Sequence, residues 1–197
     1  MSLIHRPSKK STKVIGVVAI PVFILLGFIY LVVGGSSNTS LTPAASVLNA
    51  GYATGIGFPK TLQAAKRSQV TTQKGCTYSV EAVYEDAGAK TGLLVEVLSC
   101  KSDASAAVAL AAARKQVTLD RTVQVPKELG KTAFATASLA PEYIIVWQAG
   151  TKMVFTAIDV NIGASTGTAT GKTSNSLTTS QRRILAQAAV KQNSLLN

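Results

Sequence analysis

The sequence predicts an α+β protein, in which an N-terminal transmembrane helix is followed by an antiparallel sheet with helices packed on one face. Three observations lead to this prediction. Residues 14–33 carry no charge at all. Farther along, short segments with the apolar alternation of strands follow one another in pairs joined by turn signals. Alanine-rich or well-capped segments lie between and after these pairs, an order typical of α+β domains. The 197 residues suffice for about one domain and a small appendage.

The uncharged run VIGVVAIPVFILLGFIYLVV is expected to be the transmembrane helix. Its 20 residues, at ~1.5 Å of rise per residue, span the ~30 Å hydrocarbon core of a bilayer. Four basic residues and no acid precede it: Arg6, Lys9, Lys10 and Lys13. The positive-inside rule therefore predicts a single-pass protein of the cell membrane, with a basic cytoplasmic stub over residues 1–13 and an extracytoplasmic C-terminal part. A cleaved signal peptide is the competing interpretation, but its apolar region is usually only ~7–15 residues long.

Residues 34–42 are small, polar and uncharged, which is typical of a flexible linker, and residues 43–197 then form the extracytoplasmic domain. The domain is expected to open with a helix over residues 43–50, because Thr42-Pro43 resembles a capped helix start and a glycine follows as a stop signal. A proline is expected to begin a second short helix over residues 59–67.

Residues 76–85 alternate between apolar and polar, and residues 92–100 form a second apolar segment after a turn region. The two are expected to pair as a β-hairpin with a cysteine at each open end. Cys76 and Cys100 are the only cysteines of the chain, and such a pair in an exported domain predicts a disulfide. In the chain-entropy model a loop of this length contributes ~3 kcal/mol of stability. Two free thiols are the alternative.

The register of this hairpin is ambiguous. Pairing Cys76 with Cys100 puts Glu96 on the face that carries Tyr78 and Val80, whereas the apolar residues of the second strand require a shift of one residue. A β-bulge or a splayed hairpin end would reconcile the two requirements.

An alanine-rich helix is expected over residues 103–119, capped by Ser102 or Asp103. A meander should follow it, because the turn signal Ala149-Gly150 separates two strongly apolar segments. Its three strands are predicted at residues 132–139, 142–148 and 152–161.

Residues 163–176, rich in Gly, Ser, Thr and Ala, are a predicted loop. Thr178 with Gln181 three positions later resembles a capping box, which predicts a final helix that ends near residue 196. Arg182 and Arg183 lie in its first turn, the less favourable end of a helix for cations. They are candidate contacts for an anionic partner, with a solvated surface as the alternative.

Three aromatic residues are candidates for a ligand-binding platform. Tyr143 and Trp147 share one face of a predicted strand, and Tyr78 lies in the preceding hairpin. Packing in the core is the first interpretation of these rings. The alternative is that they face a small apolar ligand held between the sheet and the helices.

The formal net charge is +11, and without the four basic residues of the stub the remaining part has 16 basic and 9 acidic residues, or +7. Such a surplus favours anionic lipid headgroups, anionic wall polymers or an acidic protein as partners, with simple solubility as the alternative. Nucleic acid is not expected, because the compartment is wrong and no aromatic and basic motif of the RNA-binding kind occurs.

The sequence offers no catalytic, metal or cofactor motif that fits its context, so no enzyme and no cofactor are predicted. Gly163–Gly167 matches the G-x-S-x-G elbow, but the single histidine, His5, lies in the stub. Gly167–Thr173 resembles a phosphate loop in which Thr166 stands where the first glycine belongs. Two cysteines without further ligands do not hold a metal. Paired carboxylates of a glycoside hydrolase remain as an alternative, with five candidates: Glu81, Glu85, Asp86, Glu96 and Glu142.

Gly75-Cys76-Thr77-Tyr78 opens a strand, a second cysteine closes the next strand, and an alanine-rich helix and the turn Leu129-Gly130-Lys131-Thr132-Ala133 follow. In this order the elements resemble a loose group of actinobacterial exported domains with a single disulfide, which includes lipoproteins and kinase sensor modules of poorly defined function. Lys131 stands where that group carries an acid, and no lipobox cysteine follows the apolar run. The resemblance implies an α+β sandwich with a binding or accessory role, and no catalytic residue.

These features together predict a non-catalytic, membrane-anchored extracytoplasmic binding or accessory module of a bacterial cell envelope. It is expected to have a protein partner in the membrane or envelope, as a subunit of a larger membrane complex. A sensing or lipid-binding domain with a small apolar ligand is one alternative. A carboxylate-dependent envelope hydrolase is the other.

Overall fold

The computed structural model describes residues 39–40, 44–66, 76–88, 91–137, 142–159 and 177–197. The predicted stub and transmembrane helix lie outside the described residues, and so do residues 163–176 with their two motifs. Among the helices that are described, none combines the length and the apolar character needed to cross a membrane.

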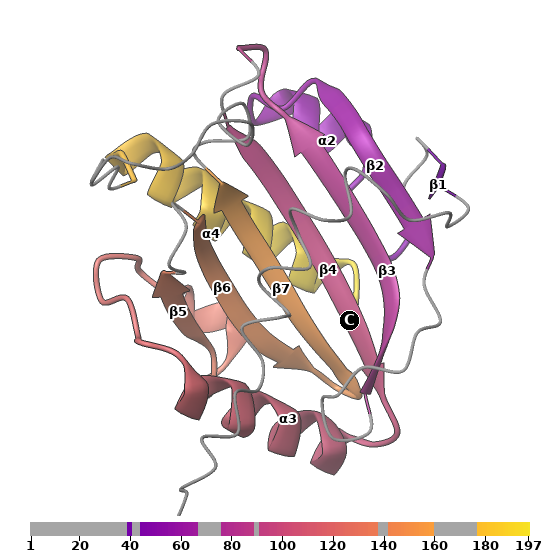
Figure 1. Cartoon of the computed structure of the whole chain (residues 1–197), viewed down its shortest axis with the longest axis vertical. Coiled ribbons are helices and arrows are strands. Elements are labelled where there is room, and N and C mark those ends of the chain that lie inside the picture. The colour runs from indigo at the N-terminus through magenta and orange to yellow at the C-terminus, as the bar shows by residue number, and fades with distance from the viewer. Residues whose placement is uncertain (1–38, 41–43, 67–75, 89–90, 138–141, 160–176) are drawn as a thin grey trace, which may run out of the picture.

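The described residues form a seven-stranded antiparallel sheet with the strand order β1-β2-β3-β4-β7-β6-β5 (Figure 1). Its strands are β1 (Thr39–Ser40), β2 (Lys60–Lys66), β3 (Cys76–Glu85), β4 (Gly92–Cys100), β5 (Phe134–Ala137), β6 (Glu142–Ala149) and β7 (Lys152–Asp159). The helices are α2 (Ala50–Gly55), α3 (Asp103–Gln116), the short 3-10 helix η1 (Lys127–Leu129) and α4 (Thr179–Ser194). The prediction of an α+β domain built on an antiparallel sheet is confirmed.

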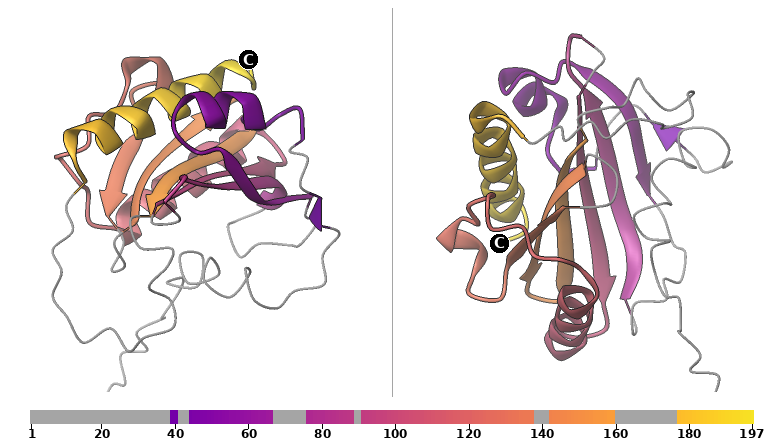
Figure 2. Two further views of the ribbon diagram at one scale, coloured as in Figure 1. Left: turned by 90° about the horizontal axis from the view of Figure 1, so that it is seen from above. Right: turned by 60° about the vertical axis from the view of Figure 1, so that its left-hand side comes forward.

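Both faces of strand β4 are buried, and the sheet has an apolar core on each side. Leu93, Val95 and Val97 belong to the first core, which α2 and α4 cover, whereas Leu94 and Leu98 belong to the second core together with residues of α3. Figure 2 shows α2 and α4 lying together on one side of the sheet. The prediction that all helices pack on one face is therefore wrong for α3. The reason is the continuous apolar pattern of β4, which needs cover on both sides.

The β3–β4 hairpin forms as predicted, and a β-bulge reconciles its two conflicting registers. Cys76 is opposite Cys100 at the open end, and the register then shifts between Tyr78 and Val80, so that Val80 is opposite Val97. The extra residue in β3 aligns the apolar residues of both strands on the first face while it keeps the cysteines paired.

The two helices predicted at residues 43–50 and 59–67 are wrong. Residues 44–49 are not helical, and α2 begins only at Ala50, because the side chain of Asn49 caps it by accepting a hydrogen bond from the Tyr52 N–H at 2.8 Å. The second predicted helix is strand β2 instead. Its pairing with β3 along nearly the whole strand satisfies its backbone groups, and this outweighs the local signal of the preceding proline.

Helices α3 and α4 form close to their predicted positions because their caps are encoded locally. The Ser102 side chain accepts a hydrogen bond from the N–H of Ser105 at the start of α3, and this helix ends at Gln116. At α4 the capping box is present: the Gln181 N–H donates to the Thr178 side chain at 3.2 Å, and the Thr178 N–H donates to the Gln181 side chain at 2.9 Å.

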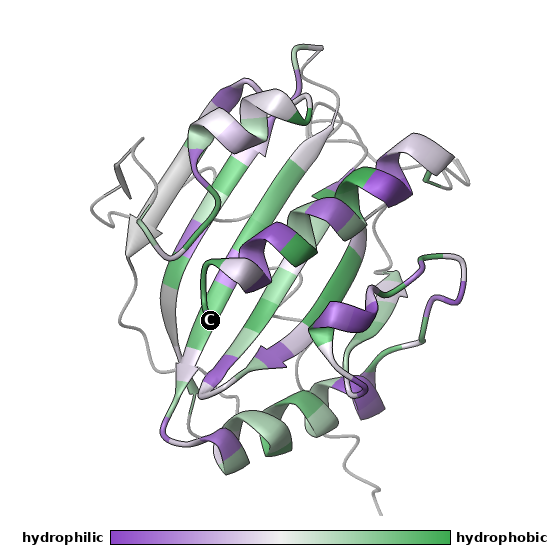
Figure 3. Ribbon diagram, turned by 180° about the vertical axis from the view of Figure 1, so that it is seen from behind, coloured by the Kyte–Doolittle hydropathy of each residue, from purple (hydrophilic) through white to green (hydrophobic). Residues whose placement is uncertain are grey.

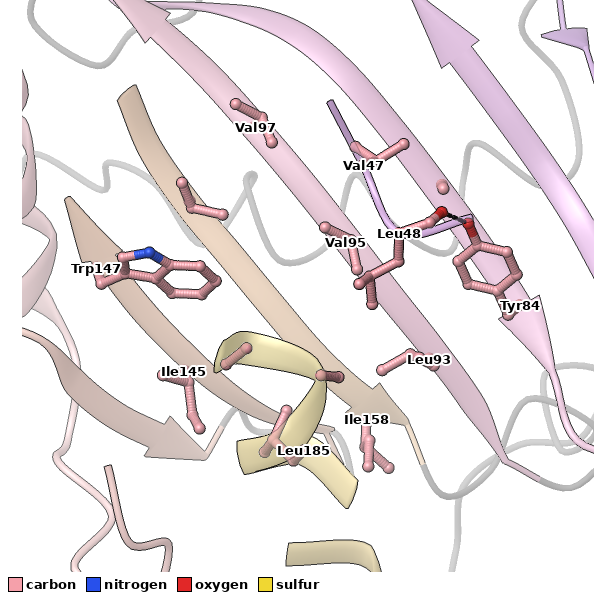
Figure 4. Packing of buried hydrophobic residues seen from close by; sticks show 14 of the residues in the cluster. Val47, Leu48, Tyr84, Leu93, Val95, Val97, Ile145, Trp147, Ile158 and Leu185 are labelled. Atoms are coloured by element: carbon pink, nitrogen blue, oxygen red, sulfur yellow. Dashed lines mark hydrogen bonds between the residues drawn. The ribbon is translucent and has the colours of Figure 1, made fainter. Parts of the chain in front are cut away.

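Two polar side chains, those of Gln192 and Tyr84, hold residues 44–49 against the core. We call this pair of side chains the N-terminal clamp. Gln192 of α4 is fully buried, accepts a hydrogen bond from the Leu48 N–H at 3.0 Å and donates one to the Ser46 carbonyl at 2.7 Å. The Tyr84 hydroxyl of β3 donates to the Leu48 carbonyl (Figure 4). The clamp thereby gives hydrogen-bond partners to backbone groups of residues 44–49, a non-helical segment that packs against the core.

Replacing Gln192 by methionine is expected to lower the free energy of unfolding by about 2 kcal/mol. Methionine fills a similar volume but leaves the buried Leu48 N–H without its partner, and an unmade buried hydrogen bond costs ~1–3 kcal/mol. Chemical unfolding followed by circular dichroism measures the change. Gln187→Met, at an exposed position of the same helix, is the matched control and should change stability little. Equal effects of the two substitutions would contradict the clamp.

The stability of the fold should fall at alkaline pH because of Tyr84. Burial raises the pKa of the Tyr84 hydroxyl above its ordinary value of ~10. The unfolded chain therefore loses this proton first, so the contribution of neutral Tyr84 is complete below pH ~10 and is lost as the pH rises above it. Tyr84→Phe should cost about 1 kcal/mol at neutral pH, because its hydrogen bond is lost, and should flatten the alkaline decline. Unfolding free energies of both proteins, measured across this pH range, test this prediction. If the alkaline decline is the same in the Tyr84→Phe protein, another group causes it.

Candidate functional site

The disulfide fixes the end of the sheet at which α3 begins. Cys76 and Cys100 are bonded as predicted, with their Cα atoms 4.0 Å apart, and the described residues contain no free cysteine. The Cys100 N–H donates to the Thr151 carbonyl at 2.8 Å, which ties the bridge to the turn between β6 and β7. The next residue, Lys101, leads directly into α3. The bridge thus joins β3 to β4 where the chain turns into this helix, and one hydrogen bond links it to the β6–β7 turn.

Of the three candidate aromatic residues, Trp147 lies in the first core. Its side chain is fully buried on β6 (Figure 4). Its Nε1–H donates to the Asn193 side chain of α4 at 3.0 Å. Tyr143 is half-buried on the same strand, and the Tyr78 side chain lies outside what the structure describes. An indole that is packed under a helix and has its N–H satisfied favours the core interpretation over a ligand platform.

The structure brings two of the five candidate acids together. Glu81 of β3 and Glu96 of β4 are directly opposite each other, so their Cβ atoms are ~5 Å apart. Their exposed fractions are only 7% and 5%, and neither residue is without an interaction partner. The spacing of the two strands therefore allows the short distance between carboxyl groups that a carboxylate mechanism requires, and both side chains are buried.

The other acids of that set are dispersed. Glu85 forms an ion pair with Lys60, at 2.8 Å between Nζ and Oε2, which links β2 to β3. Asp86 follows at the hairpin turn and is half-buried, and the Glu142 side chain lies outside the described residues. Among the described residues, no group of three or more His, Cys, Asp or Glu side chains is placed to hold a metal ion.

Arg182 and Arg183 lie in the first turn of α4, as predicted, but they face different surroundings. Arg183 is exposed to solvent. Arg182 is half-buried, and its Nε atom is buried without a hydrogen-bond partner among the described residues. The structure therefore does not bring the two guanidinium groups into one described site.

The described surface is more basic than the composition alone suggests, because acids and bases differ in exposure. Eight described basic residues are exposed: Lys60, Lys101, Arg114, Lys115, Arg121, Lys127, Lys131 and Arg183. Among the acids whose side chains are described, only Asp103 and Glu128 are exposed to this degree. Five of the exposed bases lie between residues 114 and 131, over the end of α3 and the segment that leads to β5. Along the sequence this stretch carries five exposed bases and one exposed acid, Glu128, which is a local excess of positive charge.

The sequence alone could not reveal this difference in exposure between acids and bases, because the difference depends on which acids the sheet buries. One signal was available: Glu81 and Glu96 each sit inside an apolar strand pattern.

Comparisons with protein-family models, with curated proteins and with solved structures found no match for the chain. The fold and the site thus define a basic, disulfide-bonded α+β domain whose exposed chemistry is cationic.

Proposed function

We propose that this chain is a single-pass membrane protein whose extracytoplasmic domain is a non-catalytic binding or accessory module for an anionic partner. The observation that carries the proposal is the exposure of five basic residues over the end of α3 and the following segment, against two exposed acids, Asp103 and Glu128, over α3 and that segment together. The uncharged run over residues 14–33 and the basic stub before it support the membrane anchor. The disulfide between Cys76 and Cys100 supports an oxidising compartment, as in the group of exported domains that the sequence resembles.

The test is gentle detergent extraction of the tagged full-length protein from its native membrane, followed by mass spectrometry of the co-purifying material. We expect an acidic membrane or envelope component in constant ratio, released as salt rises, because exposed charge pairs are screened by salt. The triple substitution of Arg121, Lys127 and Lys131 by glutamate should abolish its recovery, whereas Arg183→Glu on α4 should not. Recovery of the protein alone, or of the same component with both variants, would contradict the proposal.

A carboxylate-dependent envelope hydrolase is the second candidate, and the juxtaposition of Glu81 and Glu96 favours it. If the pair acts in glycoside cleavage, full-length protein should release reducing ends from cell-wall polysaccharide, and either Glu81→Gln or Glu96→Gln should abolish this release. Circular dichroism of each variant would show that the fold is kept. Absence of release from the unaltered protein would remove this candidate and leave the binding module in place.

A further inference from the structure

The described chain up to the end of α2 forms an arm that packs on the rest of the domain. This exchange arm, as we call it, consists of β1, residues 44–49 and α2, and a turn over residues 56–59 joins it to β2. Figure 3 views the sheet from the side on which α2 and α4 lie. Val47, Leu48 and Ala53 of the arm have at most 1% of their surface exposed and belong to the first core. The arm thus fills part of a core to which one short turn connects it.

The contacts that hold the arm come from other parts of the chain. Strand β1 pairs with the last part of β2, and the N-terminal clamp binds the backbone of residues 44–49 from β3 and α4. On α2, the Tyr52 hydroxyl donates to the Gln187 carbonyl of α4 at 3.3 Å. The Lys191 ammonium lies 6.0 Å from the centre of the Tyr52 ring. None of these contacts involves the turn at residues 56–59, so the same contacts form whether the arm belongs to the same copy or to another.

The turn between α2 and β2 is closed by a glycine. Gly57 has a φ of +100°, in the left-handed region that residues with a side chain rarely adopt. Its N–H and that of Phe58 donate to carbonyls of α2, at 3.1 and 2.8 Å, and these two hydrogen bonds keep the turn closed. Pro59 favours an extended backbone at the preceding residue. An extended backbone at Gly57 as well would direct α2 away from its own sheet, and water would replace the two hydrogen bonds.

We propose that the exchange arm of one copy packs on the body of a second copy, and that the partner's arm packs back, which gives an arm-exchanged dimer. The described contacts of the arm are all kept in such a dimer, so its stability relative to two separate copies depends on the turn and on concentration. A foreign peptide would have to supply an apolar pair for the core and an aromatic ring for Lys191, whereas a second copy carries Val47, Leu48 and Tyr52 already. The inference does not depend on the proposed membrane anchor or on the proposed anionic partner.

The first test is a cross-link between two differently tagged copies of the full-length protein, co-expressed and purified in detergent micelles. One copy carries Tyr52→Cys and the other carries Lys191→Cys, at positions whose side chains meet in the structure. The two native cysteines are bonded to each other, so the introduced thiols are the ones that react with a bifunctional maleimide. We expect a covalent heterodimer that carries both tags. Both substitutions in one chain show that the two positions react.

The matched control for the cross-link replaces Lys191→Cys by Arg183→Cys. Arg183 is exposed on the same helix, about two turns before Lys191. An exchanged arm brings Tyr52→Cys to position 191 and not to position 183, so this pair should give little heterodimer. Equal yields from the two pairs would show random collision of the copies and overturn the exchange.

The second test separates an arm exchange from a dimer in which both arms stay closed. Gly57 and Gly55 both have open space where a Cβ atom would lie, but only Gly57 has a positive φ. Gly57→Ala therefore disfavours the closed turn and not the opened one. The dimer association constant, measured by analytical ultracentrifugation in density-matched detergent, should rise about tenfold, from the cost of a left-handed backbone at a residue with a side chain. Gly55→Ala should leave it nearly unchanged.

Two outcomes would overturn the exchange in different ways. If the chain with both cysteines is cross-linked internally, no heterodimer forms and the Gly57→Ala protein stays monomeric, the arm remains on its own copy. If a heterodimer forms but Gly57→Ala does not raise the association constant, the copies associate with closed arms. A heterodimer whose amount increases with Gly57→Ala and not with Gly55→Ala is the result that we expect.

Discussion

Replacing Trp147 by alanine is expected to lower the free energy of unfolding by about 3–5 kcal/mol, the range for removing a large aromatic side chain from a core. Trp147 is fully buried between β6 and α4 (Figure 4). Its indole N–H also binds Asn193, whose own amide donates to the Glu128 carbonyl at 3.2 Å. The ring therefore joins the sheet, α4 and η1. A typical domain is stable by only ~5–15 kcal/mol, so this loss removes a large share of the total.

Unfolding of the full-length protein in detergent micelles, followed by circular dichroism, measures the effect of the Trp147 substitution. Two controls divide it into its parts. Asn193→Ala removes the indole hydrogen bond and should cost about 1 kcal/mol, and Trp147→Phe keeps most of the apolar volume and should lose less than alanine does. A Trp147→Ala protein as stable as the unaltered one would mean that the ring does not fill the core.

Replacing both Cys76 and Cys100 by alanine should lower the free energy of unfolding by about 3 kcal/mol. The bridge joins residues 24 positions apart, and closing a loop of that size restricts the unfolded chain by this amount in the entropy model. A reducing agent should destabilise the unaltered protein by a similar amount and leave the double variant unaffected. If the reducing agent acts equally on both proteins, the stabilisation comes from something other than the disulfide.

Elements with strong local signals were predictable from the sequence. The β3–β4 hairpin carries strand alternation and a cysteine at each end, and α4 carries a capping box; both form where expected. The helix predictions for the start of the domain were wrong because the sequence signals there are local, whereas the observed conformation depends on contacts with other parts of the chain. A proline and several residues with good helix propensity precede or fill residues 60–66, but pairing with β3 determines their conformation.

The candidate site was less predictable than the fold. Composition indicates a basic domain, but the small number of exposed acids depends on the burial of acids such as Glu81 and Glu96 in the sheet. Helix α3 packs on the second face of the sheet because β4 is apolar on both faces. In the sequence alone, the same pattern also fits a strand that is buried on one face and paired with a register shift. The role of Gln192 could not be read from its neighbours in sequence, because its partners lie near the opposite end of the chain.

The N-terminal clamp has a consequence for the timing of folding during synthesis. The Leu48 N–H and the Ser46 carbonyl find their partner only in Gln192, which is 144 and 146 positions later in the chain. At ~5–20 residues per second, the ribosome needs roughly 7–30 s to supply that partner. For this interval the strands have no α4 to cover their first face. Residues 44–49 are among the first described parts of the domain to be made, yet they are among the last to be secured.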